Sequence, residues 1–207
     1  MGILIEWFGH SCFRLTANGY SVVVDPYADD SVPGLPPLRI PADWVLCTHS
    51  HSDHCFPQAV RVSQRGIPCP FSVSAVSSFH DAEKGAKRGM NLIYVFEANG
   101  LRAVHFGDVG CRPSAAQLDF LGRPDAALIP VGGFYTIDAA EAKALAGKLN
   151  ARVVIPMHYR AQTFGLSKIG PLSDFTKLCG DVVQYAESSI LLGENTPKQT
   201  AVLTYRP

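Results

Sequence analysis

The chain opens with three short apolar runs separated by turn residues. The runs cover residues 3–8, 12–16 and 20–25, with Gly9-His10 and Asn18-Gly19 between them. Asn-Gly between two apolar runs is a strong signal for a β-hairpin. The pattern therefore predicts an antiparallel meander of three strands at the start of the fold.

Six further apolar runs predict buried strands along the rest of the chain. They cover residues 43–48, 70–76, 91–97, 101–106, 125–131 and 153–158. Ala98-Asn99-Gly100 joins the third and fourth of these runs and predicts a second hairpin. Near the end of the chain, residues 171–179 are expected to be helical and residues 201–205 to form a last strand.

One helix is predicted with a recognisable start. Asp138 followed by Glu141 is a capping pattern, and Ala142, Leu145 and Leu149 form an apolar stripe at helical spacing. The stripe is typical of core packing. Because this helix lies between two predicted strands, the three elements form a β-α-β unit.

Composition indicates a single folded domain over residues 1–207, with 47% hydrophobic and 17% charged residues. The 18 basic and 18 acidic residues cancel, so the basic surface that nucleic-acid binding requires is not expected. No apolar run approaches the roughly 20 residues of a membrane span, and the first residues lack the basic segment of a secretory signal. We therefore expect a cytoplasmic protein with no nucleic-acid or membrane partner, and leave a homo-oligomer open. The six cysteines have no C-x-x-C pair and are expected to stay reduced.

A dense group of metal-binding side chains follows the run 43–48. His49, His51, Asp53 and His54 lie within six residues, and their imidazoles and carboxylate are donors that Zn²⁺ and its first-row neighbours accept. In extended backbone, His49 and His51 project to the same face and can bind one ion. Asp53 and His54 are expected to bind a second ion where the chain turns. A site for a single ion is the main alternative, and a solvated loop without metal is a weaker one.

The motif His49-x-His51-x-Asp53-His54 resembles the signature of the metallo-β-lactamase superfamily. The resemblance implies an α/β fold, the αββα sandwich in which two mixed β-sheets are flanked by helices and one or two metal ions are bound. The Gly9-His10 pair resembles the opening of a subgroup that contains ascorbate-6-phosphate lactonase and N-acyl-phosphatidylethanolamine phospholipase D.

Three distant residues fall where the superfamily places its remaining ligands. His80 would supply the third imidazole of the first ion, Asp108 would bridge the ions, and His158 would complete the second. A lone histidine at a strand end is more often a surface or core residue, so order along the chain carries these assignments. His105 competes with His80, but its odd separation from Asp108 puts it on the opposite face of a strand. We interpret His105 as a structural imidazole behind the ligands.

Four more residues are expected near the ions. Asp25 matches the strand-end aspartate that the superfamily places behind a metal-binding histidine, and a turn cap is its alternative. His10, Tyr135 and Arg160 are candidates for substrate contact. The alternatives are a histidine that fixes the first hairpin, a tyrosine that covers the core edge and a solvated arginine.

A long loop is predicted over residues 28–42, which contain four prolines and Gly34. In the superfamily, loops on this side of the sheet overhang the pocket. Leu35 and its neighbours are therefore expected to shape substrate access, with a plain surface excursion as the alternative.

The ligand set predicts hydrolysis of a small-molecule substrate. Two divalent ions, most simply Zn²⁺ although the same donors accept Mn²⁺ or iron, would lower the pKa of a bridging water to about 7 and supply hydroxide. Asp53 is expected to orient this nucleophile or carry its proton. The leading hypothesis is a metal-dependent hydrolase acting on a small anionic metabolite, a lactone or a phosphodiester. The alternative is a metal-binding or ligand-sensing protein without turnover on the same fold.

Overall fold

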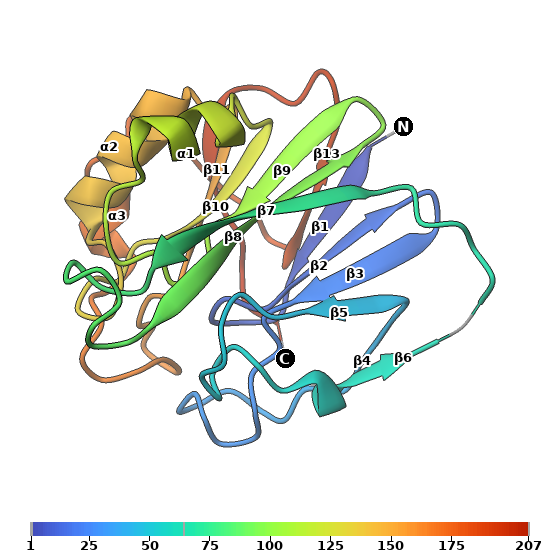
Figure 1. Cartoon of the computed structure of the whole chain (residues 1–207), viewed down its shortest axis with the longest axis horizontal. Helices are drawn as coiled ribbons and strands as arrows, with labels where there is room; N and C mark the ends of the chain where they lie inside the picture. The colour runs from blue at the N-terminus through green and yellow to red at the C-terminus, as the bar shows by residue number, and fades with distance from the viewer. Residues whose placement is uncertain (1, 64, 207) are drawn as a thin grey trace.

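The structure is a computed structural model that describes residues 2–63 and 65–206. Two β-sheets form the body of the fold (Figure 1). The first sheet has five strands in the order β13-β1-β2-β3-β5, and only β5 runs parallel to its neighbour. Its strands are β1 (Ile3–Trp7), β2 (Phe13–Ala17), β3 (Tyr20–Val24), β5 (Trp44–Leu46) and β13 (Ser189–Leu192). The predicted opening meander is confirmed by the antiparallel pairing of β1, β2 and β3.

The second sheet has seven strands in the order β12-β14-β11-β10-β9-β8-β7. The strands from β12 to β9 are parallel, and β7, β8 and β9 pair antiparallel. They are β7 (Ser72–Phe79), β8 (Met90–Ala98), β9 (Leu101–His105), β10 (Ala126–Pro130), β11 (Val153–Met157), β12 (Val182–Gln184) and β14 (Gln199–Val202). A separate parallel pair joins β4 (Ile40–Ala42) to β6 (Val60–Val62).

Burial explains why these runs form strands in these places. β1 alternates buried and half-buried residues, as a strand with one core face does. Every residue of β10 and β11 is buried, because parallel strands in the middle of a sheet are covered on both faces. The apolar residues of both sheets belong to one core, and all six cysteines are free thiols.

The helices α1, α2 and α3 lie together beside the seven-stranded sheet (Figure 1). They are α1 (Ala115–Leu121), α2 (Ala139–Leu149) and α3 (Ser173–Thr176), and a 3-10 turn covers Pro57–Ala59. The predicted capping box of α2 is present. The Asp138 side chain accepts a hydrogen bond from the backbone N–H of Glu141, and the Glu141 side chain accepts one from the backbone N–H of Asp138. Its stripe of Ala142, Leu145 and Leu149 is buried. Within the described residues, no helix has the length and apolarity to cross a bilayer.

Several elements differ from the sequence-based expectation. Helix α1 was not predicted, although Ser114 and Gln117 form a capping box in front of it. The helix expected over residues 171–179 is reduced to the single turn α3. The loop predicted over residues 28–42 ends in strand β4. On the outer side of the five-stranded sheet, half-buried side chains of β1 and β2 and the pair β4–β6 line an open surface.

Candidate metal centre

The candidate site is assembled where strands of both sheets end. Its side chains come from the segments that directly follow β1, β3, β5, β7, β9 and β11. The backbone at three of these ends is left-handed, with φ of 49° at His10, 53° at Asp25 and 53° at His158. Such angles are uncommon for residues with a side chain and are found at functional sites. The residues assembled there are His10, Asp25, His49, His51, Asp53, His54, His80, Asp108 and His158.

The first group consists of His49, His51 and His80. A nitrogen of each ring lies within 4.8 Å of the others. The loop after β5 supplies the first two, and β7 ends one residue before His80. Nδ1 of His80 lies 3.2 Å from the carbonyl oxygen of Tyr135, which fixes the ring and leaves Nε2 directed toward Asp108. The structure therefore brings together the three imidazoles expected for the first ion.

The second group contains Asp53, His54 and His158, and His10 lies within it. One donor atom of each lies within 4.8 Å of the others. Burial, followed by the neighbouring His158, lowers the pKa of His10 to about 4, so its imidazole is neutral at pH 7. Nε2 of His10 lies 3.3 Å from Oδ2 of Asp53. Because His10 is fully buried, the structure places it behind Asp53 and not at the substrate side, where we expected it.

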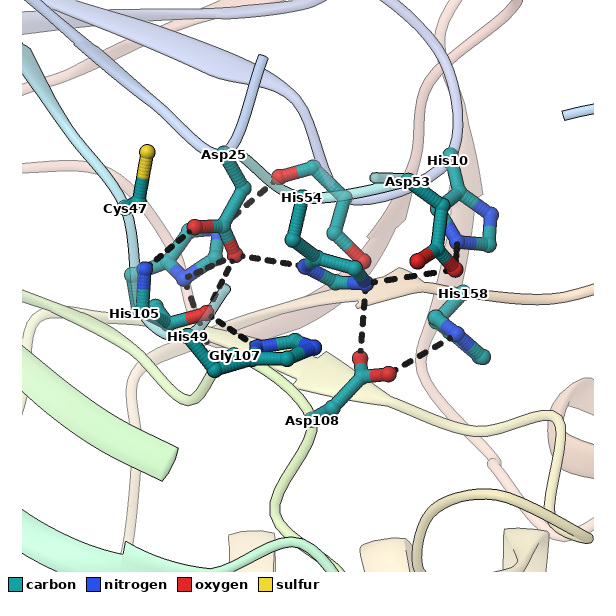
Figure 2. Close-up of polar contacts among 12 residues, drawn as sticks. His10, Asp25, Cys47, His49, Asp53, His54, His105, Gly107, Asp108 and His158 are labelled. Atoms are coloured by element: carbon teal, nitrogen blue, oxygen red, sulfur yellow. Dashed lines mark hydrogen bonds and ion pairs between the residues drawn. The ribbon is translucent and has the colours of Figure 1, made fainter. Parts of the chain in front are cut away.

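Asp108 faces imidazoles of both groups, and Figure 2 shows its contacts with His54 and His158 of the second group. Its Oδ1 lies 3.1 Å from Nε2 of His54, and its Oδ2 lies 3.1 Å from Nε2 of His158. The same Oδ2 lies 3.3 Å from Nε2 of His80. Burial opposes ionisation of Asp108, but His158 and His54 outweigh it and hold its pKa well below the usual range. The side chain is therefore a carboxylate that faces imidazoles of both groups.

The unpaired atoms of this cluster fit divalent cations. Nε2 of His49, Nε2 of His54, both ring nitrogens of His158 and Oδ1 of Asp108 are buried and form no hydrogen bond of acceptable geometry among the described residues, although Nε2 of His54 and Oδ1 of Asp108 lie 3.1 Å apart. Buried polar atoms in folded proteins nearly always have partners. Several unpaired nitrogen and oxygen donors at one centre are the arrangement that a Zn²⁺-type ion satisfies.

Asp25 holds the inner side of the cluster. It is fully buried, and its carboxylate accepts hydrogen bonds from the backbone and hydroxyl of Thr48 at 2.7 and 2.8 Å. Nδ1 of His54 lies 2.8 Å from Oδ2 of Asp25. Burial opposes ionisation, but His54 lowers the pKa of Asp25. Since a carboxylate only accepts, Nδ1 of His54 carries the proton and its Nε2 is free to bind a cation.

His105 and Asn91 shape the turn that carries Asp108. Nε2 of His105 donates to the carbonyl of Ser11 at 2.9 Å, and Nδ1 accepts from the Gly107 backbone at 3.1 Å. Oδ1 of Asn91 accepts from the Asp108 backbone at 2.9 Å. His105 thus lies behind the ligands, where the sequence reasoning put it. Asn91 was missed, because one asparagine at the start of an apolar run carries no chemical signal.

An open cavity of about 350 Å³ leads to the cluster. Tyr135 lines it, whereas Arg160 does not, since its Nε donates to the carbonyl of Ile169 at 3.2 Å. Leu35 does not line the cavity. It is buried, and its side chain packs closely against Gly9. The full lining is Ser31, His51, Ser52, Asp53, His80, Arg88, Asp108, Tyr135 and Leu166. Ser31 is thus the residue of the predicted loop that borders the cavity, and Arg88 is a lining residue that sequence reasoning missed.

Comparison with known proteins identifies the family. Residues 4–158 match the model of the beta-lactamase superfamily domain. The chain belongs to this superfamily. A crystal structure from Thermotoga maritima, assigned to the Zn-dependent hydrolases of the metallo-β-lactamase superfamily, is 31% identical, with a TM-score of 0.73 and 97% of both chains covered. The predicted resemblance to the metallo-β-lactamase superfamily and the predicted fold class are confirmed.

Curated relatives of this superfamily member agree in their activity. A metal-dependent hydrolase from Thermoplasma acidophilum is 29% identical over 213 residues, covering 87% of this chain and 92% of the relative. A metal-dependent hydrolase from Archaeoglobus fulgidus is also 29% identical, covering 84% of this chain and 89% of the relative. The resemblance of Gly9-His10 to the lactonase and phospholipase subgroup stays a prediction.

Proposed function

We propose that this metal-dependent hydrolase binds two divalent cations and cleaves a lactone or a phosphodiester of a small anionic metabolite. His49, His51 and His80 would hold the first ion, and Asp53, His54 and His158 the second. The observation that carries the proposal is the position of Asp108, whose two oxygens lie 3.1 to 3.3 Å from imidazoles of both groups. Zn²⁺ suits the histidine-rich donor set, and Mn²⁺ and iron are its alternatives.

When bound, such cations polarise a carbonyl or phosphoryl oxygen and make water acidic enough to supply hydroxide near pH 7. Asp53 is the carboxylate of this chain that fits the role of directing the attacking water. It borders the open cavity and its side chain is 19% exposed, whereas His54 and His158 are buried. Burial opposes ionisation, but His10 lowers the pKa of Asp53. Asp53 is therefore ionised throughout the neutral range, where it can accept a hydrogen bond from the attacking water and orient it.

The substrate class follows from charge and from the cavity. Two divalent cations carry four positive charges, and the ligand set contains only two carboxylates, Asp53 and Asp108. The floor of the cavity is therefore electropositive and favours anionic molecules. Tyr135 lines the cavity, and its hydroxyl would donate a hydrogen bond to a substrate oxygen. The resemblance at Gly9-His10 favours lactones and phosphodiesters within this class.

A panel of lactones, phosphodiesters and thioesters tests the proposal with protein loaded with Zn²⁺ or Mn²⁺. We expect turnover on at least one lactone or phosphodiester. Asp53→Asn should lower kcat by about 100-fold or more, the range of a lost general base, and leave the first ion bound. Asp29→Asn is the matched control, since Asp29 is exposed and paired with Arg39. A blank panel with both ions bound favours the non-catalytic binding protein.

A further inference from the structure

Arg88 supplies a positive charge at the mouth of the metal cavity. Among the residues that line this cavity, it is the one lysine or arginine in the part of the chain that the structure describes. It also lines a neighbouring cavity together with Lys87 and Arg112. The side chain thus stands between the metal cluster and a second hollow, where an elongated substrate would pass.

The backbone at Arg88 is fixed by a buried carboxylate. Asp81 is 3% exposed and directly follows the candidate ligand His80. Its Oδ1 accepts from the backbones of Glu83 and Gly85 at 2.8 and 3.0 Å. Its Oδ2 accepts from the backbones of Lys87 and Arg88 at 3.0 and 2.8 Å. The turn that presents a candidate metal ligand therefore also sets the position of Arg88.

The guanidinium of Arg88 is positioned by aromatic rings and keeps its charge unpaired. Its central carbon lies 5.2 Å from the ring centre of Tyr135 and 5.9 Å from that of Phe134, within the range of cation–π attraction. Arg102 and Arg112 have carboxylates at 2.7 and 3.8 Å. Arg88 has none within ion-pair distance among residues 2–63 and 65–206. Its N–H donors are therefore available to a ligand.

Phe134 adds a second indication of a binding surface. This bulky residue has a left-handed φ of 60° and is 56% exposed. Lys168 lies on its ring with Nζ 5.0 Å from the centre. A strained, exposed aromatic residue between two cations costs stability and gains nothing from burial. A binding role beside the metal cavity accounts for it.

We propose that Arg88 binds an oxyanion group of the substrate, a carboxylate or a phosphate, that is distinct from the bond being hydrolysed. The substrate then has two functional ends, a cleavable lactone or phosphodiester at the cations and a free oxyanion at the guanidinium. Arginine matches both oxyanions through two parallel N–H donors. This inference rests on the proposed function for the identity of the end that faces the cations.

Binding of glutarate and valerate to the metal-loaded protein tests the inference. Both acids have five carbons and one carboxylate for the cations, and glutarate has a second carboxylate for Arg88. Calorimetry should show that wild-type protein prefers glutarate by about tenfold, as expected for one charge-assisted interaction. Arg88→Met should remove the preference, and Arg88→Lys should retain part of it. 4-Phosphonobutyrate, compared with glutarate, shows which oxyanion is preferred.

Lys87→Met is the matched control, because it removes the same charge from the adjacent residue, whose ammonium pairs with Glu83. It should leave the preference for glutarate unchanged. Metal content and circular dichroism of each variant show whether the cluster and the fold are intact. Equal preferences in wild-type protein and Arg88→Met, or no preference in wild-type protein, would overturn the role of Arg88.

Turnover separates this inference from the proposed function. With the mono-p-nitrophenyl ester of glutarate, Arg88→Met should raise KM about tenfold with little change in kcat. With p-nitrophenyl valerate, both constants should stay the same. If no ester, lactone or phosphodiester is cleaved but the binding preference depends on Arg88, the proposed hydrolysis fails and the oxyanion site stands. If cleavage occurs and substitution of Arg88 changes neither binding nor KM, the proposed hydrolysis stands and the oxyanion site fails.

Discussion

His54 and Asp25 form a fully buried pair in which Nδ1 of the imidazole donates to Oδ2 of the carboxylate at 2.8 Å (Figure 2). The pair directs Nε2 of His54 toward Asp108, 3.1 Å away. Burial opposes a charge on His54, but the carboxylates of Asp108 and Asp25 outweigh it and raise its pKa well above the usual range. A cation bound at this position would take over the role that the proton has in the metal-free protein.

Asp25→Asn is expected to weaken binding of the second cation by about 10- to 100-fold, the usual effect of losing a partner behind a metal-binding histidine. Asparagine fits the left-handed backbone at this position, where φ is 53°, so the fold should persist. Competition with a chromogenic chelator measures the affinity. Asp29→Asn serves as the control on an exposed carboxylate. Unchanged affinity in Asp25→Asn would show that the pair does not orient His54.

The chain is also expected to bind two cations, and His51→Ala to bind one. His51 is the exposed member of the first group, so its removal takes away a donor without opening a hole in the core. Native mass spectrometry of the metal-loaded proteins counts the ions. One ion in the wild-type protein would favour the single-ion alternative and remove the bridging role of Asp108.

The candidate ligand residues could be found in the sequence because each follows a strand that the apolar pattern predicts. β10 and β11 are buried throughout, so they appear as continuous apolar runs. Helix α1 was not visible, since Leu121 is its one buried residue and no apolar stripe results. Strands β4, β6 and β12 have three residues each, too few for a periodic pattern, and unlike the equally short β5 they do not lie in one of the predicted apolar runs.

Side chains set by tertiary packing could not be placed in the same way. His10 was expected at the substrate. Instead its ring packs against the ring of His158, with the two ring centres 4.2 Å apart, and the side chain is buried behind the cluster. Arg88 lies in a polar loop where nothing in the pattern distinguishes it from Lys87. Its position depends on four hydrogen bonds to Asp81 and on the aromatic residues that follow β10.

Gly107→Ala should destabilise the protein and disturb the cluster. The φ at Gly107 is 52°, and an added Cβ would lie 2.3 Å from Oδ1 of Asn91 and 2.6 Å from Cβ of Thr48. Gly100→Ala is the matched control, because Gly100 has a φ of 74° and open space around the added Cβ. The control should cost about 1–2 kcal/mol for its backbone alone, and Gly107→Ala about 1–3 kcal/mol more for the clash.

Urea unfolding measures both glycine variants, and elemental analysis measures their metal content. Only Gly107→Ala should lose bound cations, since Asn91 holds the backbone of Asp108. Equal costs in the two variants would show that the turn before Asp108 can relax around a methyl group.

Protonation of Asp43 is expected to lower the stability of the protein in acid. Its side chain is 4% exposed. It accepts from Nε of Arg65 at 2.8 Å and from the backbone of Ser21 at 2.8 Å. Hydrogen bonding by Arg65, partly opposed by burial and aided by Ser21, lowers the pKa of Asp43 to about 2. A depressed pKa in the folded state adds stability that is complete above the unfolded value near 4 and is lost as the pH falls from about 4 to 2.

The expected contribution of Asp43 is about 1–2 kcal/mol at neutral pH, because Arg65 is half exposed and solvent screens the pair. Urea unfolding at pH 7, 4 and 2.5, with chelator present so that cation loss does not contribute, should show Asp43→Asn destabilised at pH 7 and close to the wild-type protein in acid. Asp119→Asn, on an exposed position of α1, should follow the wild-type curve. If the loss of unfolding free energy in Asp43→Asn is as large at pH 2.5 as at pH 7, Asp43 stabilises the protein through its packing and not through its charge.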